Sequence, residues 1–218
     1  MENVLELSLK DAAMLAINQK LILQSVGWEV YEQVLKQYQD SNEVHFAYDD
    51  GFLEVEVPLS KHEIPIGVLS DLITTICVEK GIDFRNVRST TFRQQAKLKG
   101  CEPDTAFYIQ NESSVRGLID IDLSRNPPPD LVIEVDVTSP SLNKLPIYAA
   151  LGVSEVWLYK GDKVTFYKLY GDFYQETPSS VALPFLNNRI VTEFLQKGAE
   201  GRTLSWFREL RKWINNND

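Results

Sequence analysis

Hydrophobic and polar residues alternate in two short runs of the stretch EVHFAYDDGFLEVEVP. The runs meet at Asp50 and Gly51, a pair that favours the tight turn of a β-hairpin. We therefore expect strands over residues 44–48 and 52–57. Upstream of the hairpin, apolar residues recur at three- and four-residue steps, which predicts a helix from about Trp28.

A longer helical pattern follows in LSKHEIPIGVLSDLITTICVEKG. Ser60 stands at the N-cap position, Glu63 at the capping-box position, and Gly81 is a typical helix end. A second helix is expected over residues 143–151, because Pro146 is tolerated only in a first turn. Short β-rich runs are expected near residues 84–88, 90–94, 104–110, 131–137, 155–159 and 163–169, and two short helices split by Gly201 end the chain.

The composition is that of a folded globular chain, with 218 residues of which 44% are hydrophobic and 24% charged. No linker or composition shift divides the sequence, so we expect a single domain over residues 1–218 with a core of about residues 52–170. No run of about 18 apolar residues occurs, and the N-terminal sequence lacks the basic start and apolar stretch of a signal peptide. We expect a cytoplasmic protein with no membrane partner, in which Cys77 and Cys101 are free thiols.

The net charge of −9 argues against strong binding of nucleic acid over the whole surface, because that affinity comes mainly from neutralising phosphates. A local basic patch is present in RNVRSTTFRQQAKLK, residues 85–99, which carries five positive charges and no negative ones. Arg88, Arg93 and Lys97 are the candidate nucleic-acid-binding residues. The same run is equally typical of a basic edge strand or loop whose charges keep the protein soluble.

Carboxylates accompany two of the predicted strands. In PPPDLVIEVDVTSPSLNK, alternation puts Asp130, Glu134 and Asp136 on one face and an unbroken apolar set on the other. Alone, such acids would be solvated, but a second strand also begins after Pro-Asp, in GCEPDTAFYIQN. If the two strands are neighbours, Asp104 and Glu134 could converge on one hard cation, and Lys144 could supply positive charge to a transition state.

This arrangement resembles the PD-(D/E)XK nuclease superfamily and, within it, the Uma-two family of restriction-endonuclease-like proteins. The pieces that carry the resemblance are GCEPDTAFYI, PPDLVIEVDVTSPSLNK and YAALGVSEVWLY. It implies an α/β (α+β) fold in which a mixed central sheet carries the acids, helices flank it, and hairpins lie at the periphery. It also implies hydrolysis of phosphodiester bonds with the help of Mg²⁺ or Mn²⁺.

Carried over residue by residue, the family's first carboxylate matches Asp104, its second-strand glutamate matches Glu134, and the acid of its first core helix matches Glu63. These three would be the metal ligands. Position 136 holds an aspartate where a standard motif has lysine, so the resemblance implies a lysine displaced to the following helix, Lys144. Asp104, Glu134 and Lys144 would then be the catalytic residues, with Asp130 or Asp136 as a further ligand through water.

We therefore expect a metal-dependent endonuclease acting on DNA, with RNA as another substrate that the sequence leaves open. A homodimer could form through the aromatic-rich C-terminal helix. The alternative is a non-catalytic nucleic-acid-binding or interaction protein with a degenerate nuclease site, which the acidic charge and Asp136 favour. A glycosidase would need more aromatic residues around its acids. We expect His62 on the surface and His45 without a partner, and a Cys101–His62 nucleophilic pair lacks a third orienting group.

Overall fold

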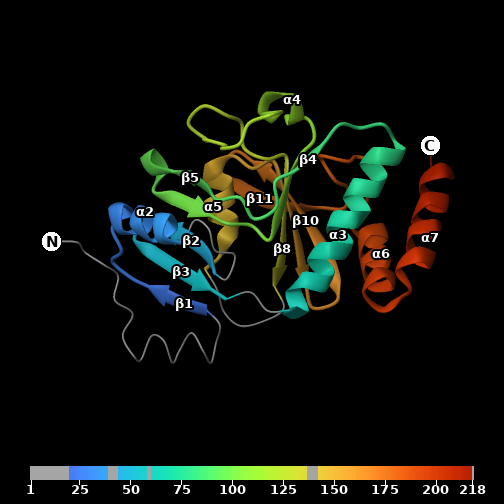
Figure 1. Ribbon diagram of the computed structural model, residues 1–218, viewed down its shortest axis with the longest axis horizontal. Helices are drawn as coiled ribbons and strands as arrows, with labels where there is room; N and C mark the ends of the chain where they lie inside the picture. The colour runs from blue at the N-terminus through green and yellow to red at the C-terminus, as the bar shows by residue number, and fades with distance from the viewer. Residues whose placement is uncertain (1–19, 39–43, 58–59, 137–141, 218) are drawn as a thin grey trace.

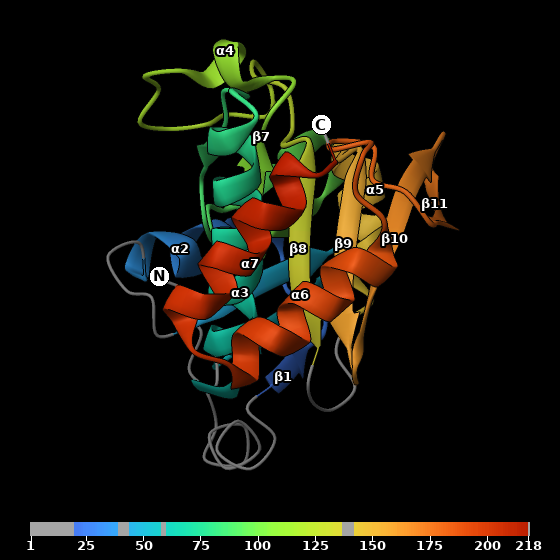
Figure 2. The same cartoon turned by 90° about the vertical axis from the view of Figure 1, so that its right-hand side faces the viewer.

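The computed structural model describes residues 20–38, 44–57, 60–136 and 142–217, which form two β-sheets with helices around and between them (Figure 1). Helix α5 (Lys144–Leu151) packs against strands of both sheets. Helix α2 (Trp28–Gln37) covers the other face of the first sheet. Helices α3 (Ser60–Glu79), α6 (Asn188–Glu200) and α7 (Thr203–Asn215) cover the other face of the second sheet (Figure 2).

The first sheet is antiparallel, in the order β1-β3-β2-β6-β5. Its strands are β1 (Lys20–Leu23), β2 (His45–Asp49), β3 (Phe52–Glu56), β5 (Phe92–Gln94) and β6 (Lys99–Cys101), with a short 3₁₀ turn η1 (Gln95–Lys97) between the last two. Strands β2 and β3 form the predicted hairpin. Asp50 and Gly51 have φ angles of 44° and 91°, the left-handed backbone that such a two-residue turn requires.

The second sheet is mixed, in the order β11-β10-β9-β8-β7-β4. Its strands are β4 (Arg85–Asn86), β7 (Thr105–Tyr108), β8 (Leu131–Asp136), β9 (Glu155–Lys160), β10 (Lys163–Tyr170) and β11 (Phe173–Thr177). Strands β8 and β9 are parallel, whereas the other pairs are antiparallel. Two parallel neighbours need a crossover connection between them, and here the connection from β8 to β9 contains α5. A one-turn helix α4 (Glu112–Val115) lies between β7 and β8.

Helix α5 has sequence-encoded ends. The Asn143 side chain accepts a hydrogen bond from the backbone N–H of Leu145 at 3.2 Å, which caps the N-terminus. Gly152, with φ of 84°, ends the helix in the left-handed conformation. These two signals fix Lys144 as the first residue of the helix, between the two sheets.

The aromatic residues of α7 pack into the chain's own core. Trp206 is buried, and its indole N–H donates to the Phe194 carbonyl at 2.8 Å. The Trp213 ring lies edge-on to Phe194 at 5.8 Å between centroids. Phe207 packs against the same cluster. These side chains therefore fill the space between α6 and α7, with Phe207 and Trp213 only partly buried, and a homodimer through this helix stays a prediction.

The predicted fold class is confirmed, because a mixed sheet lies between α5 on one face and three helices on the other. The predicted strands and helices all appear with small shifts at their ends, while β1, β6, β11 and α4 were not predicted. The β2–β3 hairpin is not peripheral, since β3 and β2 lie inside the first sheet. Among the residues described, none of the helices has the length and apolar character needed to cross a membrane.

Candidate functional site

Strand β8 turns a carboxylate toward α5. Leu131 and Ile133 are buried in the core formed with α3, α6 and α7, and Val132 is buried in the core formed with α5. Since side chains alternate along a strand, Glu134 lies on the α5 side, where it is 8% exposed. The alternation predicted for this strand is thus confirmed.

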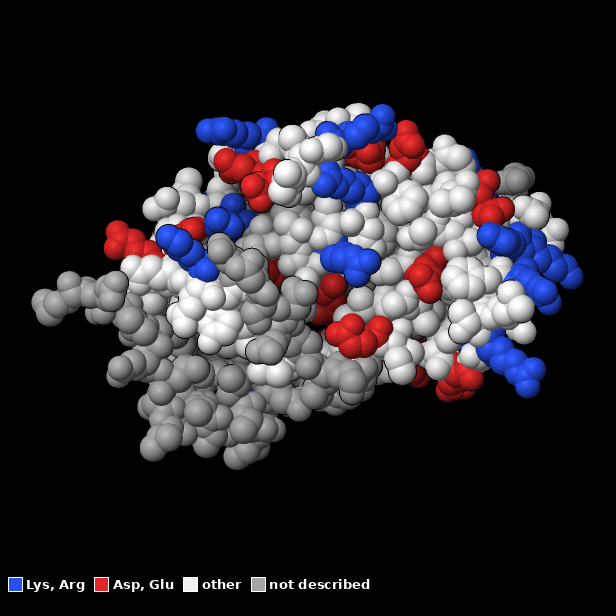
Figure 3. Space-filling model, viewed as in Figure 1, with Lys and Arg blue, Asp and Glu red and all other residues white. Residues whose placement is uncertain are grey.

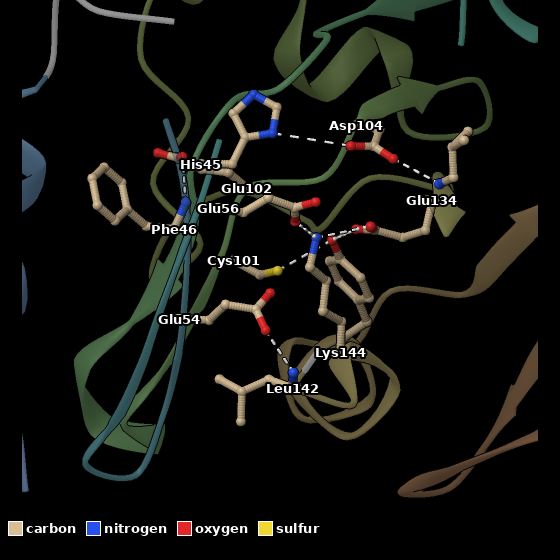
Figure 4. A network of polar contacts seen from close by, with 12 residues as sticks. His45, Phe46, Glu54, Glu56, Cys101, Glu102, Asp104, Glu134, Leu142 and Lys144 are labelled. Atoms are coloured by element: carbon tan, nitrogen blue, oxygen red, sulfur yellow. Dashed lines mark hydrogen bonds and ion pairs between the residues drawn. The ribbon is translucent and has the colours of Figure 1, made fainter. Parts of the chain in front are cut away.

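Strand β3 turns two more carboxylates toward the same helix from the opposite side. Leu53 and Val55 pack against α2, so Glu54 and Glu56 face α5 and are 1% and 7% exposed. In sequence, LEVEV carries the same alternation of apolar and acidic residues as LVIEVD of β8. Carboxylates from the two sheets therefore face each other across the N-terminal end of α5 (Figure 4).

Lys144 lies between these two sets of acids. Its Nζ is 2.9 Å from Glu134 Oε2 and 3.8 Å from Glu56 Oε2. The other oxygen of Glu56 lies 3.1 Å from Lys20 Nζ, on the neighbouring strand β1. Burial alone would lower the pKa of Lys144, but the surrounding carboxylates, Glu134 first, raise this pKa well above its usual value. Lys144 is therefore a fixed positive charge inside the cluster.

Glu134 is held on both of its oxygens. Lys144 binds Oε2, and the Tyr148 hydroxyl donates a hydrogen bond to Oε1. The Cys101 thiol lies 3.3 Å from the same hydroxyl, so α5 and β6 together orient the Tyr148 ring. Burial raises the pKa of Glu134 to about 7, although Lys144 and Tyr148 act to lower this pKa.

Asp104 immediately precedes β7, next to β8. Its Oδ2 accepts a hydrogen bond of 2.6 Å from the backbone N–H of Val135, and its Oδ1 lies 4.0 Å from Nδ1 of His45. Burial raises the pKa of Asp104 and lowers the pKa of His45. His45 therefore lies beside Asp104 at a distance too long for a hydrogen bond, and burial favours its neutral imidazole.

Two further carboxylates, the buried Glu54 and the partly exposed Glu102, border the cluster. Glu102 accepts hydrogen bonds from the backbone N–H of Phe46 at 2.9 Å and from the Thr91 hydroxyl at 2.5 Å. Glu54 accepts one of 2.6 Å from the backbone N–H of Leu142, through Oε2. Its other oxygen, Oε1, is buried and has no hydrogen-bond partner among the residues that the structure describes. A buried acceptor of this kind costs free energy unless something binds it.

The donor chemistry of the cluster fits a divalent metal ion. Three buried carboxylates, Glu54, Glu56 and Glu134, and two partly exposed ones, Asp104 and Glu102, meet two lysines and a histidine whose environment favours its neutral form. Carboxylate oxygens are the ligands that Mg²⁺ and Mn²⁺ prefer, and the surplus of acid favours a cation. Within the described ranges, however, no group of three or more His, Cys, Asp or Glu side chains is already gathered as a metal centre. Lys144 lies between Glu134 and Glu56, where it pairs with both.

Of the predicted site residues, the structure brings Asp104, Glu134 and Lys144 together, and it does not bring Glu63 to them. Glu63 is exposed in the first turn of α3, where a carboxylate is stabilised by the helix N-terminus and needs no metal. His62, expected on the surface, is 3% exposed.

The other two acids of the β8 pattern have structural partners. Asp130 is buried and accepts hydrogen bonds from the backbone N–H groups of Ile109 and Asn111 and from the Asn111 side chain. Asp136 pairs with Lys160 at 2.7 Å near the surface. Neither contacts the cluster around Lys144, which instead contains Glu54, Glu56, Glu102, His45 and Tyr148, none of them predicted.

Some basic residues of the run 85–99 have partners within the fold, and others are exposed. Lys97 donates to the carbonyl of Ala150 in the last turn of α5, and Arg93 pairs with Glu32 of α2 at 2.8 Å. Arg88 is exposed, and its guanidinium makes no contact with the described residues. Arg88 and Arg93 both line a hollow of about 780 Å³ that also reaches His45.

Figure 3 shows Lys and Arg side chains scattered among acidic ones, with no continuous basic surface on that face. This distribution agrees with the net charge of −9. Any contact with nucleic acid on this face would therefore be local.

The chain resembles a known protein family and several solved structures. The model of the Uma2 (Uma-two) family, described as "Putative restriction endonuclease", matches residues 28–205. A crystal structure from Anabaena variabilis, described as a "putative nuclease belonging to DUF820", is 18% identical, with a TM-score of 0.46, over 69% of this chain and 90% of its own. No curated protein matches the chain. Since the family match extends over most of the sequence and includes Asp104, Glu134 and Lys144, the chain belongs to the Uma2 family.

Proposed function

We propose that the protein is a metal-dependent endonuclease that hydrolyses phosphodiester bonds in DNA. The observation that carries the proposal is the meeting of Asp104, Glu134 and Lys144 in one buried cluster with more carboxylates than nearby lysines can neutralise. Family membership supports a nuclease in general. The metal, the substrate and the residue roles are our inference from the chemistry of the cluster.

Asp104 and Glu134 would hold the metal, which we take to be Mg²⁺, with Mn²⁺ as a substitute. Glu54 and Glu56 replace Glu63 as the third and fourth candidate ligands, because they face the cluster and one oxygen of Glu54 has no hydrogen-bond partner in the described part of the chain. When bound, such an ion lowers the pKa of a coordinated water and polarises the phosphate.

Lys144 would stabilise the negative charge that develops on the phosphate during hydrolysis. A preorganised cation in a water-poor site lowers a barrier more than it could in bulk water. Here Glu134 and Glu56 hold the ammonium group in place, and Tyr148 holds Glu134 in turn. Phosphate oxygens entering the cluster would compete with these carboxylates for the ammonium hydrogens.

The basic residues would hold the substrate rather than react with it. Arg88 is exposed at the rim of the hollow, and Arg93 lines the same hollow from β5. Lys97 is engaged with α5 and Arg93 with Glu32, so we expect Arg88 to contribute most. Contacts from arginine to phosphate position a nucleic acid without reading its sequence.

A second function is favoured by one specific observation. Lys144 is engaged by Glu134 and Glu56, and the described residues hold no preassembled metal centre. A nucleic-acid-binding protein with a degenerate nuclease site would keep this ion pair permanently. In that protein the acids would only stabilise the fold.

Cleavage of supercoiled plasmid separates the two functions. We would compare the native protein with Asp104→Asn and Glu134→Gln in Mg²⁺, in Mn²⁺ and in chelator, with Asp136→Asn as the matched control because Asp136 pairs outside the cluster. Metal-dependent nicking that is lost in the two cluster variants and kept in the control supports the nuclease. Binding of DNA without cleavage under any of these conditions supports the binding protein. Labelled RNA of the same sequence tests the choice of DNA.

A further inference from the structure

A hollow of about 780 Å³ lies beside the cluster, on the side of the first sheet. Its walls are formed by α2, by β2 and by the turn that joins β4 to β5. This volume is within the range of about 300–1,000 Å³ that is common for small-molecule sites. A single nucleotide fits such a space, whereas a stacked duplex does not enter it.

The floor of the hollow is preformed. The Glu102 carboxylate accepts hydrogen bonds from Phe46 of β2 and from Thr91 of the turn, so one buried side chain ties the two walls together. Within the turn, the backbone N–H of Arg88 binds the Asn86 side chain at 2.8 Å, and Arg88 has a φ of 53°. This left-handed backbone is unfavourable for a non-glycine residue. The turn holds Arg88 exposed at the rim in spite of that cost.

The lining combines an aromatic ring with separate cations. Tyr38 is 36% exposed, and its ring is tilted against Phe46 with 5.6 Å between the centroids. Lys36, Arg88 and Arg93 are the cationic lining residues, and Glu32, Glu102 and Asp120 are acidic. An uninterrupted track of phosphates would meet these acids. A ligand with one flat ring, a hydrogen-bonding edge and one or two phosphates matches the lining better.

The hollow is connected to the candidate active site through His45. This residue lines the hollow, and its Nδ1 lies 4.0 Å from Asp104 Oδ1. Figure 4 shows His45 and Glu102 on the same side of the cluster as Asp104. A nucleotide held in the hollow would therefore place a neighbouring phosphate beside the carboxylates.

We propose that this hollow binds one unpaired nucleotide of a DNA strand, with its base on Tyr38 and its phosphate at Arg88 and Arg93, so that the protein prefers unpaired DNA to duplex. The inference rests on the proposed nuclease function, and it names the form of the substrate. Bases in a duplex are already stacked and paired, so occupying the hollow from a duplex costs the free energy of unstacking one base. A single strand does not carry that cost.

Binding in chelator tests the inference without cleavage. The probes are fluorescein-labelled oligo(dT) and a blunt duplex of equal length, followed by fluorescence anisotropy. We expect oligo(dT) to bind more tightly than the duplex, and Tyr38→Ala to weaken oligo(dT) binding about fivefold or more, as for loss of one stacked base. Tyr38→Phe keeps the ring and should bind like the native protein. Tyr170→Ala, which removes a tyrosine of similar exposure from the end of β10, is the control.

Arg88 gives an independent variant on an exposed side chain, so folding is not at risk. Arg88→Ala should weaken binding and reduce the slope of log affinity against log salt by about one unit, while Arg125→Ala, a control at another exposed arginine, should not. Equal or tighter binding of duplex, or unchanged oligo(dT) affinity in both Tyr38→Ala and Arg88→Ala, overturns the inference.

Cleavage in Mg²⁺ separates the failure of this inference from that of the nuclease proposal. If Asp104→Asn abolishes cleavage while Tyr38→Ala keeps the native ratio of single-strand to duplex cleavage, the nucleotide site is wrong and the nuclease stands. If no variant or metal gives cleavage but Tyr38→Ala still weakens oligo(dT) binding, the nucleotide site stands and the nuclease is wrong.

Discussion

The Lys144 ammonium lies 2.9 Å from Glu134 and 3.8 Å from Glu56, so one side chain joins strands of two different sheets. Both acids are buried, and each has one further polar partner, Tyr148 for Glu134 and Lys20 for Glu56. Burying a charge in this way is favourable only while its counter-charge remains. The lysine therefore has a structural role whether or not it has a catalytic one.

Removing Lys144 should destabilise the fold strongly. In Lys144→Ala, Glu134 and Glu56 lose a shared counter-ion inside the protein, and breaking a buried pair in this way costs about 3–5 kcal/mol. Urea unfolding followed by tryptophan fluorescence measures the loss. Lys160→Ala is the matched control, because it breaks the pair with Asp136 at a lysine that is 68% exposed. A native midpoint in Lys144→Ala would mean that the carboxylates are protonated or solvated without it.

Stability should fall as the pH rises through the acid range. The folded-state pKa of Glu134, about 7, lies above the value of a free glutamate, about 4.3, so the folded protein keeps a proton that the unfolded chain releases. Its stabilising contribution, about 4 kcal/mol in total, is complete below about pH 4.3, decreases as the pH rises to about 7, and is absent above that. Burial raises the pKa of Asp104 and Glu54 too, which adds to the same slope.

Urea unfolding in chelator at about pH 5 and about pH 7.5 checks this slope. Glu134→Gln cannot titrate, so its free energy of unfolding should change less between the two values than that of the native protein. An equal change in both proteins would show that Glu134 is ionised across the whole range.

Glu54 and Glu155 are both buried carboxylates, but they differ in how many hydrogen bonds their oxygens accept. Glu155 accepts from the Trp157 indole, the Ser180 hydroxyl and two backbone N–H groups, whereas Glu54 has an oxygen without a partner among the described residues. In chelator, Glu155→Gln should cost about 1–3 kcal/mol because an amide cannot accept all of these bonds. Glu54→Gln should change stability by less than about 1 kcal/mol.

Added metal should stabilise Glu155→Gln more than Glu54→Gln. Mg²⁺ should raise the melting temperature of the native protein and of Glu155→Gln, since a ligand at a hundred times its Kd stabilises by about 2.7 kcal/mol. The rise should be smaller in Glu54→Gln, and chelator should remove it in every case. A full metal-induced rise in Glu54→Gln would remove Glu54 from the ligands.

Gly100 should be intolerant of a side chain, because a Cβ there would collide with the buried Tyr31 ring, which is stacked on Tyr48 at 4.8 Å. Gly100→Ala should cost about 1–3 kcal/mol by overpacking. Gly67, in α3, has no atom within 4 Å of the Cβ position, and Gly67→Ala should stabilise by about 0.4–1 kcal/mol. Thermal melting of both variants measures the difference, and a neutral Gly100→Ala would mean that Tyr31 can move aside.

The proximity of Asp104 and Glu134 could be predicted from the sequence, because each acid accompanies an apolar strand and the two strands, β7 and β8, are paired; their roles as metal ligands stay a prediction. LEVEV has a similar alternation, which puts Glu54 and Glu56 on one face of the hairpin. They were not predicted, because a hairpin can turn its polar face toward solvent and nothing in the local sequence indicates that α5 covers this face. Asp130 and Glu134 have the same pattern and different roles. Only their partners, Asn111 for one and Lys144 for the other, separate them.

Glu63 illustrates the opposite error. Glu63 lies in the first turn of α3, where the helix N-terminus stabilises a carboxylate without any metal. Its assignment as a metal ligand came only from the family resemblance. Tyr148 and His45 could not be predicted, because their roles depend on contacts between residues far apart in the chain, such as Cys101 with Tyr148 and His45 with Asp104.

Helix α5 packs against both sheets, and this position links the unfolding of one sheet to that of the other. If either sheet opened alone, the acids of the remaining one would keep Lys144 but lose the apolar contacts that hold α5 between the sheets. We therefore expect the backbone amides of β3 and β8 to become accessible to hydrogen exchange in a single cooperative opening. Because β4 of the second sheet precedes β5 and β6 of the first along the chain, no single cut separates the two sheets, and a nick in either one should weaken the core around α5 and the carboxylate cluster together.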